Sequence, residues 1–385
     1  MSRDAMRMLA EARPDELNPG LPVEAGTRER ELARARLGTP ADTQAHDQAG
    51  TRRRAFRPVW GLGLAGIAAA AVAAAVLVAP GGHDAPAKTP GSGAPQALDG
   101  RTILLTAAES ADRQPGGAGA FWHVTRLTRE YVRVGDAADP YTVIAESRSE
   151  NWTPNAPTGA QIARSQDLGA RPATPADKVA WSKAGSPTSW VQKIPASKGG
   201  AYKPRPLSAS PGKPSTSRTP LRRGEIFWLG RNVTMKDLRG LPADPKALKK
   251  ALLRWYEGHG TEADGQKSTA DEWLFDVARG LLTDMPVTPK VRAATFRLLA
   301  GLPSVASLGR VTDAQGRPGV AIGLTRPTPA GDVLQTRLIV DASAGRALGE
   351  AEVLVKRSDR FPGVPAGSVL NSATVTAEWT ATSPS

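Results

Sequence analysis

Cysteine is absent from this chain of 385 residues. Its absence excludes disulfide bonds, thiolate metal sites and cysteine nucleophiles. Histidine is scarce as well, and two of the four, His46 and His83, lie outside the part of the chain that we expect to fold. The other two, His123 and His259, have no histidine neighbour at the close spacing that zinc sites usually use. We therefore predict no metal ion and no cofactor.

Two motifs of catalysis and nucleotide binding, G-x-S-x-G and G-x-x-x-x-G-K-[ST], are missing too. Carboxylates do gather at Asp271, Glu272 and Asp276, and a carboxylate pair is what glycoside hydrolysis needs. However, Asp271 and Glu272 fall in the first turn of an expected helix, where acidic side chains favour the helix dipole. We therefore predict no catalytic, cofactor-binding or metal-binding residue.

What the chain does have is a long uncharged segment. Residues 59–79 are 21 uncharged and mostly apolar residues, enough to cross a bilayer as one helix. An arginine cluster directly precedes them: Arg52, Arg53, Arg54 and Arg57. Because basic residues stay on the cytoplasmic side, we predict a transmembrane helix over 58–79 with the N-terminus inside. The alternative, a cleaved signal peptide, would need an unusually long region before its apolar part.

A G-x-G-x-x-G motif in the same segment, at Gly61, Gly63 and Gly66, has no strand before it and no amphipathic helix after it, so a dinucleotide site is not expected. The topology divides the chain into four parts. Residues 1–57 are a mostly disordered cytoplasmic tail, 58–79 the membrane helix, 80–98 a linker rich in Pro, Gly and Ala, and 99–385 an extracytoplasmic domain.

The pattern over 99–385 predicts strands, then helices, then strands. Capping residues Asp244, Thr269 and Thr288 begin three amphipathic helices. Expected strands cover 121–134, 141–152, 225–233, 305–311, 320–324, 333–340, 347–355 and 369–379. This order indicates an α+β domain with an antiparallel, half-barrel-like sheet and helices on one side. On the first and third helices, one apolar face is expected to bury against the sheet: Leu248, Leu252, Trp255, Leu298 and Leu299.

Much of the formal net charge of +13 lies in a stretch without acidic residues, 178–223. Within it, residues 193–219 are expected to form a basic, flexible insertion. The predicted topology places the stretch outside the cell, which excludes nucleic acid as a partner. Anionic lipid headgroups or anionic envelope polymers are the candidate partners, and a solvated loop with no partner is the alternative.

Nine tryptophans against four tyrosines is an unusual ratio. In a half-barrel they would either line a groove for an acyl chain or a glycan, or fill the core. We favour the core.

Several segments resemble a family of actinobacterial single-pass membrane proteins that has no established activity. The matching segments are L-P-A-D-P-x-x-L at 241–248, the run from Leu281 to Pro303, D-A-Q-G-R-P-G-V-A-I at 313–322 and R-L-I-V-D-A-S-A-G-R-A-L at 337–348. The resemblance implies an outer domain like the half-barrels of lipoprotein carriers and of periplasmic regulators of sigma-factor release.

The sequence thus favours a non-enzymatic, membrane-anchored extracytoplasmic domain that binds or senses an envelope component. Its tail is expected to contact a cytoplasmic regulator. A lipid or lipoprotein carrier that uses the concave face of the sheet is the first alternative, and an envelope hydrolase is the weaker one.

Overall fold

A computed structural model describes residues 99–136, 138–194, 203–228, 231–261, 267–328, 331–357, 361 and 363–384. The predicted tail, membrane helix and linker lie outside these residues. Within the described ranges, no helix is both long and apolar enough to cross a bilayer.

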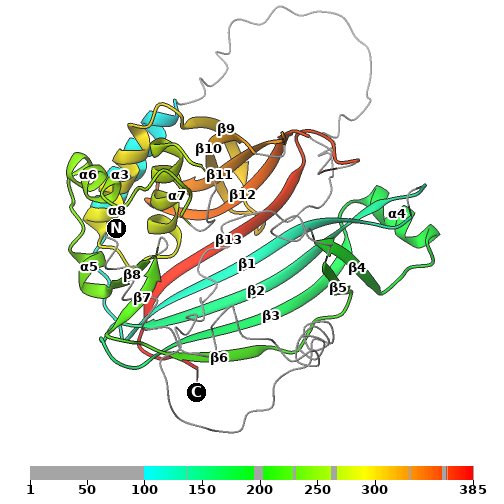
Figure 1. Cartoon of the computed structure of the whole chain (residues 1–385), viewed down its shortest axis with the longest axis horizontal. Coiled ribbons are helices and arrows are strands. Elements are labelled where there is room, and N and C mark those ends of the chain that lie inside the picture. Colours follow the sequence, from blue (N-terminus) through cyan, green and yellow to red (C-terminus); the bar gives the residue numbers. More distant parts are fainter. Residues whose placement is uncertain are drawn as a thin grey trace, which may run out of the picture. The chain divides into compact units, whose positions relative to one another are not determined.

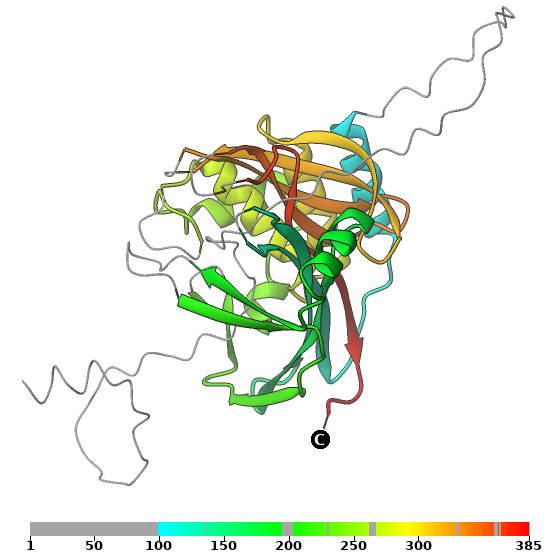
Figure 2. The same ribbon diagram turned by 90° about the vertical axis from the view of Figure 1, so that its right-hand side faces the viewer.

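The fold is α+β and is built on one antiparallel sheet of nine strands (Figure 1). Their order across the sheet is β6-β3-β2-β1-β13-β12-β11-β10-β9. The strands are β1 (Phe121–Val134), β2 (Tyr141–Pro154), β3 (Ala160–Pro172), β6 (Ser215–Pro220), β9 (Ala306–Thr312), β10 (Pro318–Pro327), β11 (Val333–Asp341), β12 (Arg346–Lys356) and β13 (Val369–Thr380). In Figure 2, β9–β12 run across the view whereas β1–β3 run down it, so the sheet is strongly twisted.

At the centre of the sheet the first strand, β1, pairs through residues 121–130 with the last strand, β13. Side chains alternate between the two faces of β1, so its even-numbered residues share one face, which we call the inner face. At one end Trp122 donates from its indole to the Asp284 carbonyl beyond α7, 2.7 Å away. At the other end Val132 and Val134 pack against Trp190 and Leu207. The inner face is therefore covered at both ends.

The described helices are α3 (Gly100–Asp112), α4 (Pro175–Lys183), α5 (Met235–Arg239), α6 (Pro245–Leu253), α7 (Ala270–Thr283) and α8 (Pro289–Ala300). Three of them, α6, α7 and α8, have the start signals that the sequence predicts, whereas α3, α4 and α5 were not predicted. Side chains of Asp244, Thr269 and Thr288 cap α6, α7 and α8, and Glu272 completes a capping box with Thr269. Figure 1 shows α3 and α5–α8 gathered at one end of the sheet.

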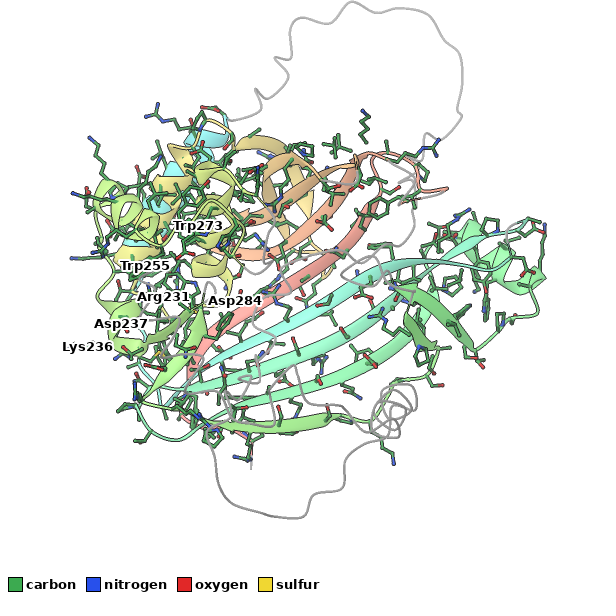
Figure 3. The ribbon with its side chains drawn as sticks, viewed as in Figure 1. Arg231, Lys236, Asp237, Trp255, Trp273 and Asp284 are labelled. Atoms are coloured by element: carbon green, nitrogen blue, oxygen red, sulfur yellow. The ribbon has the colours of Figure 1, made fainter. Side chains whose placement is uncertain are left out.

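The helices and the sheet share one large hydrophobic core. Leu248 and Leu252 of α6 and Leu298 and Leu299 of α8 are buried in the same cluster as sheet residues such as Leu338, as predicted. Trp255 is a correction. The helix ends at Leu253, so Trp255 leaves the apolar face and is 44% exposed, and the Arg231 guanidinium lies 3.1 Å from its ring centroid. Figure 3 shows both residues at the helical end of the molecule, near Lys236 and Asp237.

Two other expectations are corrected. The strand expected over 225–233 is a hairpin of β7 (Glu225–Trp228) and β8 (Arg231–Thr234), in which Trp228 pairs with Arg231 around two residues. Of the segment 193–219, expected to be a basic, flexible insertion, residues 195–202 lie outside the described residues. The rest contains β5 (Lys203–Ser208) and β6, and β5 pairs with β4 (Ser189–Ile194).

Two unpredicted strands, β5 and β6, contain residues that are rare in central strands. β5 belongs to a two-stranded sheet and carries two prolines, which an edge position accepts because it needs no ladder donor there. β6 is polar and exposed along its whole length, and among the described strands it pairs only with β3. These strands are therefore defined by backbone hydrogen bonds. Such bonds do not require apolar residues at alternate positions, so the sequence shows no strand pattern there.

Candidate functional site

The two histidines considered above as metal ligands both contact neighbouring side chains. His123 lies on the outer face of β1, where its ring stacks on Trp152 with centroids 4.4 Å apart. Burial lowers its pKa, although the carboxylate of Glu150 opposes the shift. His259 is half exposed and lies 3.4 Å from the exposed carboxylate of Glu257. In the ranges that the structure describes, no group of three His, Cys, Asp or Glu residues is arranged to hold a metal ion.

The carboxylates of α7 separate into two roles. Asp271 and Glu272 stand in the first turn, as expected from their position. Asp276 instead turns toward the sheet and pairs with Arg279 of its own helix and with Arg326 of β10, at 3.4 and 2.9 Å. Asp276 is therefore an ion-pair partner of two arginines, whereas Asp271 and Glu272 stand at the start of the helix.

A buried ionic network continues from Asp276 and ties α7 to the inner face. Glu350 of β12 accepts hydrogen bonds from both Arg126 of β1 and Arg279 of α7. Arg126 also donates to the Asp284 carboxylate at 2.8 Å, at the point where the helical end meets the sheet (Figure 3). Burial alone would raise the pKa of Glu350, but the guanidiniums of Arg279 and Arg126 lower it to about 2. The network keeps its charges compensated and holds a helix in place.

Most tryptophans of the strands and helices are core residues. Trp122, Trp152, Trp228 and Trp273 are all buried. Among them, Trp122 also lines a cavity, which is described next. The basic stretch 178–223 is not a free loop throughout, because Arg205 of β5 pairs with Glu130 on the inner face of β1.

A cavity of about 310 Å³ opens where β12 and β13 separate, beneath the ends of α3, α7 and α8. Three arginines line it, Arg292 of α8, Arg317 before β10 and Arg346 at the start of β12. The other lining residues are Gln114, Trp122, Leu282, Thr283, Ala347, Leu348, Val375, Thr376 and Ala377. None of these twelve described residues is acidic, so the lining is strongly cationic.

A second cavity of about 700 Å³ adjoins the first. Its wall is largely apolar and comes from α3, β9, β10 and the turn between β11 and β12, with Ile103, Val320 and Val340 among the lining residues. Arg317, Arg346 and Leu348 line both cavities, so the two meet at this triplet. We call them the small cavity and the large cavity.

Arg317 is held rigidly between the two cavities. Its Nε donates to the Asp313 carboxylate at 2.6 Å, and its Nη2 donates to the Leu348 carbonyl at 2.7 Å. Asp313 in turn accepts from the backbone N–H groups of Gln315 and Arg317. The D-A-Q-G-R turn thereby fixes a guanidinium in the gap between β12 and β13, where Arg317 also reaches the Val375 carbonyl.

The β11–β12 turn, D-A-S-A-G, is seated directly on α3. Gly345 has a φ of +60°, and a Cβ at this position would collide with the backbone of Ala111. Gln114, just beyond α3, donates to the carbonyl of Ala344 in the same turn. The close approach places Arg346, whose side chain is 58% exposed, at the rim of both cavities.

The sequence did not single out these arginines, because each is separated from the others by tens of residues. Arg292, Arg317 and Arg346 lie in the segments 281–303, 313–322 and 337–348, but no motif in the sequence marked them as a group. Chemically, the arrangement is suited to binding an anion beside an apolar group, because cationic and apolar walls adjoin.

No protein-family model matches the chain, and no curated protein is similar to it. Among solved structures, one chain from the complex structure of Pseudomonas aeruginosa MucA/MucB is similar, at 14% sequence identity and a TM-score of 0.22. The similarity covers 74% of this chain and 58% of that chain, so this chain spans little more than half the length of the solved one. The match assigns neither a family nor an activity.

Proposed function

We propose that this chain is a non-enzymatic, membrane-anchored extracytoplasmic domain that binds and senses an amphipathic component of the cell envelope. The observation that carries the proposal is the large cavity of about 700 Å³, which has an apolar wall next to cationic side chains. Pockets of this size and lining are typical of ligand-binding sites. The apolar part of the ligand lies against α3, Val320 and Val340.

The membrane anchor and the outward orientation rest on the sequence, through the uncharged residues 59–79 and the preceding arginines. In this proposal the curved sheet acts as a half-barrel whose inner face is occupied by helices and by the β4–β5 hairpin. A ligand seated between α3 and the sheet then changes how the two pack, and the tail 1–57 passes that state to a cytoplasmic regulator.

A carrier function is the second candidate, and the covered inner face of the sheet argues against it. A carrier needs an open apolar face, whereas the described inner face is covered at both ends and crossed by the network of Arg126, Arg279 and Glu350. The cavities beside α3 therefore favour a fixed ligand site over a transport groove.

The test is binding of a small neutral amphiphile, hexyl glucoside, to the full chain in lipid nanodiscs, measured by calorimetry. Thr106 of α3 lines the large cavity, and Thr106→Trp fills it. We expect this variant to lose binding by about tenfold or more, because it removes the volume that the hexyl group occupies.

Leu105→Trp is the control, since Leu105 belongs to the same helix, is 37% exposed and does not line the cavity. Its affinity should equal that of the wild type. Equal affinity in all three proteins, or no binding by the wild type, would overturn the proposed site.

A further inference from the structure

The small cavity contains a guanidinium, that of Arg292, with no described carboxylate beside it. Arg292 projects into it from α8, and its Nη1 donates to the amide oxygen of Gln114 at 2.7 Å. Across the described residues, no carboxylate is within ion-pair distance of this guanidinium. Burial lowers the pKa of Arg292, and no carboxylate opposes the shift. The chain therefore keeps a half-buried cation without a compensating carboxylate, at a cost in stability.

The other arginines of the cavity differ in this respect. Arg317 is paired with Asp313 and bound to two backbone carbonyls. Arg346 lies 3.9 Å from the carboxylate of Asp341, a loose contact at the exposed rim. That carboxylate already accepts hydrogen bonds from Ser343 and from the backbone of Ala344. Positive charge thus exceeds negative charge around the cavity.

Gln114 gives the guanidinium of Arg292 a fixed direction. It accepts from Arg292 through its oxygen and donates through its nitrogen to the carbonyl of Ala344, which orients the amide. Arg292 is therefore anchored on one side and presents its remaining N–H donors to the cavity. Thr376, which lines the same space, adds a hydroxyl group, whereas the hydroxyl of Thr283 is already bonded to the Arg279 carbonyl and the Asp284 carboxylate.

We infer that the small cavity is an oxyanion site that takes a phosphate group, with Arg292 as its principal ligand and Arg346 closing over it from the rim. A phosphate suits the site because it carries more than one negative charge and offers several acceptor oxygens to a guanidinium fork. Because Arg317, Arg346 and Leu348 line both cavities, the phosphate is the headgroup of the ligand whose apolar part fills the large cavity. The inference rests on the proposed function and names the ligand class.

The experiment compares three probes on the full chain in nanodiscs: hexyl phosphate, hexyl glucoside and inorganic phosphate. Hexyl phosphate should bind about tenfold or more tightly than hexyl glucoside, because charged hydrogen bonds to Arg292 are added to the same apolar contact. Inorganic phosphate should bind more weakly than hexyl phosphate. If inorganic phosphate binds as tightly, the site takes a free anion and the headgroup assignment is wrong.

Arg292→Gln removes the charge, and Arg297→Gln is the control. Arg297 lies on the same helix, is not among the residues that line the cavity and pairs with Asp112 at 3.5 Å. Arg292→Gln should lose the preference for hexyl phosphate, keep the affinity for hexyl glucoside, and have a melting temperature at or above that of the wild type, because an uncompensated charge is gone. Arg297→Gln should keep the preference.

The outcomes separate the two proposals. If hexyl phosphate and hexyl glucoside bind equally well and Thr106→Trp weakens both, the large cavity binds amphiphiles and the oxyanion site is wrong. If Arg292→Gln lowers the melting temperature and leaves the preference intact, Arg292 is a structural residue and the inference is overturned.

Discussion

At the scale of residues, the interior of this domain contains two kinds of charged side chain, those paired with an opposite charge and, at Arg292, one that is not. Arg126 and Arg279 are compensated by Glu350 together with Asp276 and Asp284, so their burial is stable as long as each partner remains. Arg292 is not compensated by any carboxylate in the described ranges, and it lies against a cavity. The contrast explains why we assign the first group to the fold and the second to ligand binding.

Replacing Glu350 should expose the role of the first group. Glu350→Gln leaves Arg126 and Arg279 without their shared carboxylate, so the free energy of unfolding should fall by about 3–5 kcal/mol at neutral pH. Denaturant unfolding followed by tryptophan fluorescence measures the change. Glu109→Gln is the control, because Glu109 is an exposed residue of α3, and it should match the wild type.

The loss of stability in Glu350→Gln should also depend on pH. The pKa of Glu350 is about 2 in the folded chain, below its ordinary value of 4.5. A lowered folded pKa contributes stability above the unfolded pKa, and that contribution is lost as the pH falls toward the folded value. The stabilities of the wild type and Glu350→Gln should therefore converge between about pH 4.5 and pH 2. A constant difference across that range would contradict this assignment.

At the scale of elements, the sequence predicted those whose signal is local. Capping residues predicted the starts of α6, α7 and α8, and β-branched and aromatic residues predicted β1. Alternation predicted β11, where Leu334, Thr336, Leu338 and Val340 are all buried. Elements that are stabilised mainly by contacts with distant parts of the chain were not predicted. α3 is rich in Ser, Thr and Ala, and it is held by packing Ala107, Ala108 and Ala111 into the core that it shares with α8.

β6 provides a test at this scale. Among the described strands it pairs only with β3, and all six of its residues are exposed, whereas β1 is paired on both sides. Local opening therefore costs β6 less than β1, and its amides should exchange with solvent deuterium much faster. Hydrogen exchange read by mass spectrometry on the peptides 215–220 and 121–134 checks this. Equal protection of both would mean that β6 is covered by a partner.

At the scale of the whole molecule, the sequence predicted the fold class but not the site. Periodicity and capping report on single segments, so they identified an α+β domain with an antiparallel sheet. The two cavities exist only because the D-A-Q-G-R turn, the D-A-S-A-G turn and the end of α3 meet in space. No spacing rule brings Gln114, Arg292 and Arg317 together, because their juxtaposition depends on the strand order of the whole sheet.

The predicted topology is also a property of the whole molecule. A reporter fused after Ser385 should be active only outside the cell, and one fused before Met1 only inside, because the arginines before residue 59 stay in the cytoplasm. Alkaline phosphatase and green fluorescent protein fusions report the two sides. Cytoplasmic activity of the fusion after Ser385 would remove the basis for an envelope ligand.

The central claim is that the cavities beside α3 hold an amphipathic ligand, and mass spectrometry of co-purifying molecules tests it most directly. The full chain and its Thr106→Trp variant would be purified in parallel from native membranes and extracted with organic solvent. Because lipids around the membrane helix are common to both, only a ligand of the cavity can differ. The wild type should retain an amphiphile that the variant lacks, whereas identical extracts from the two proteins would contradict the claim.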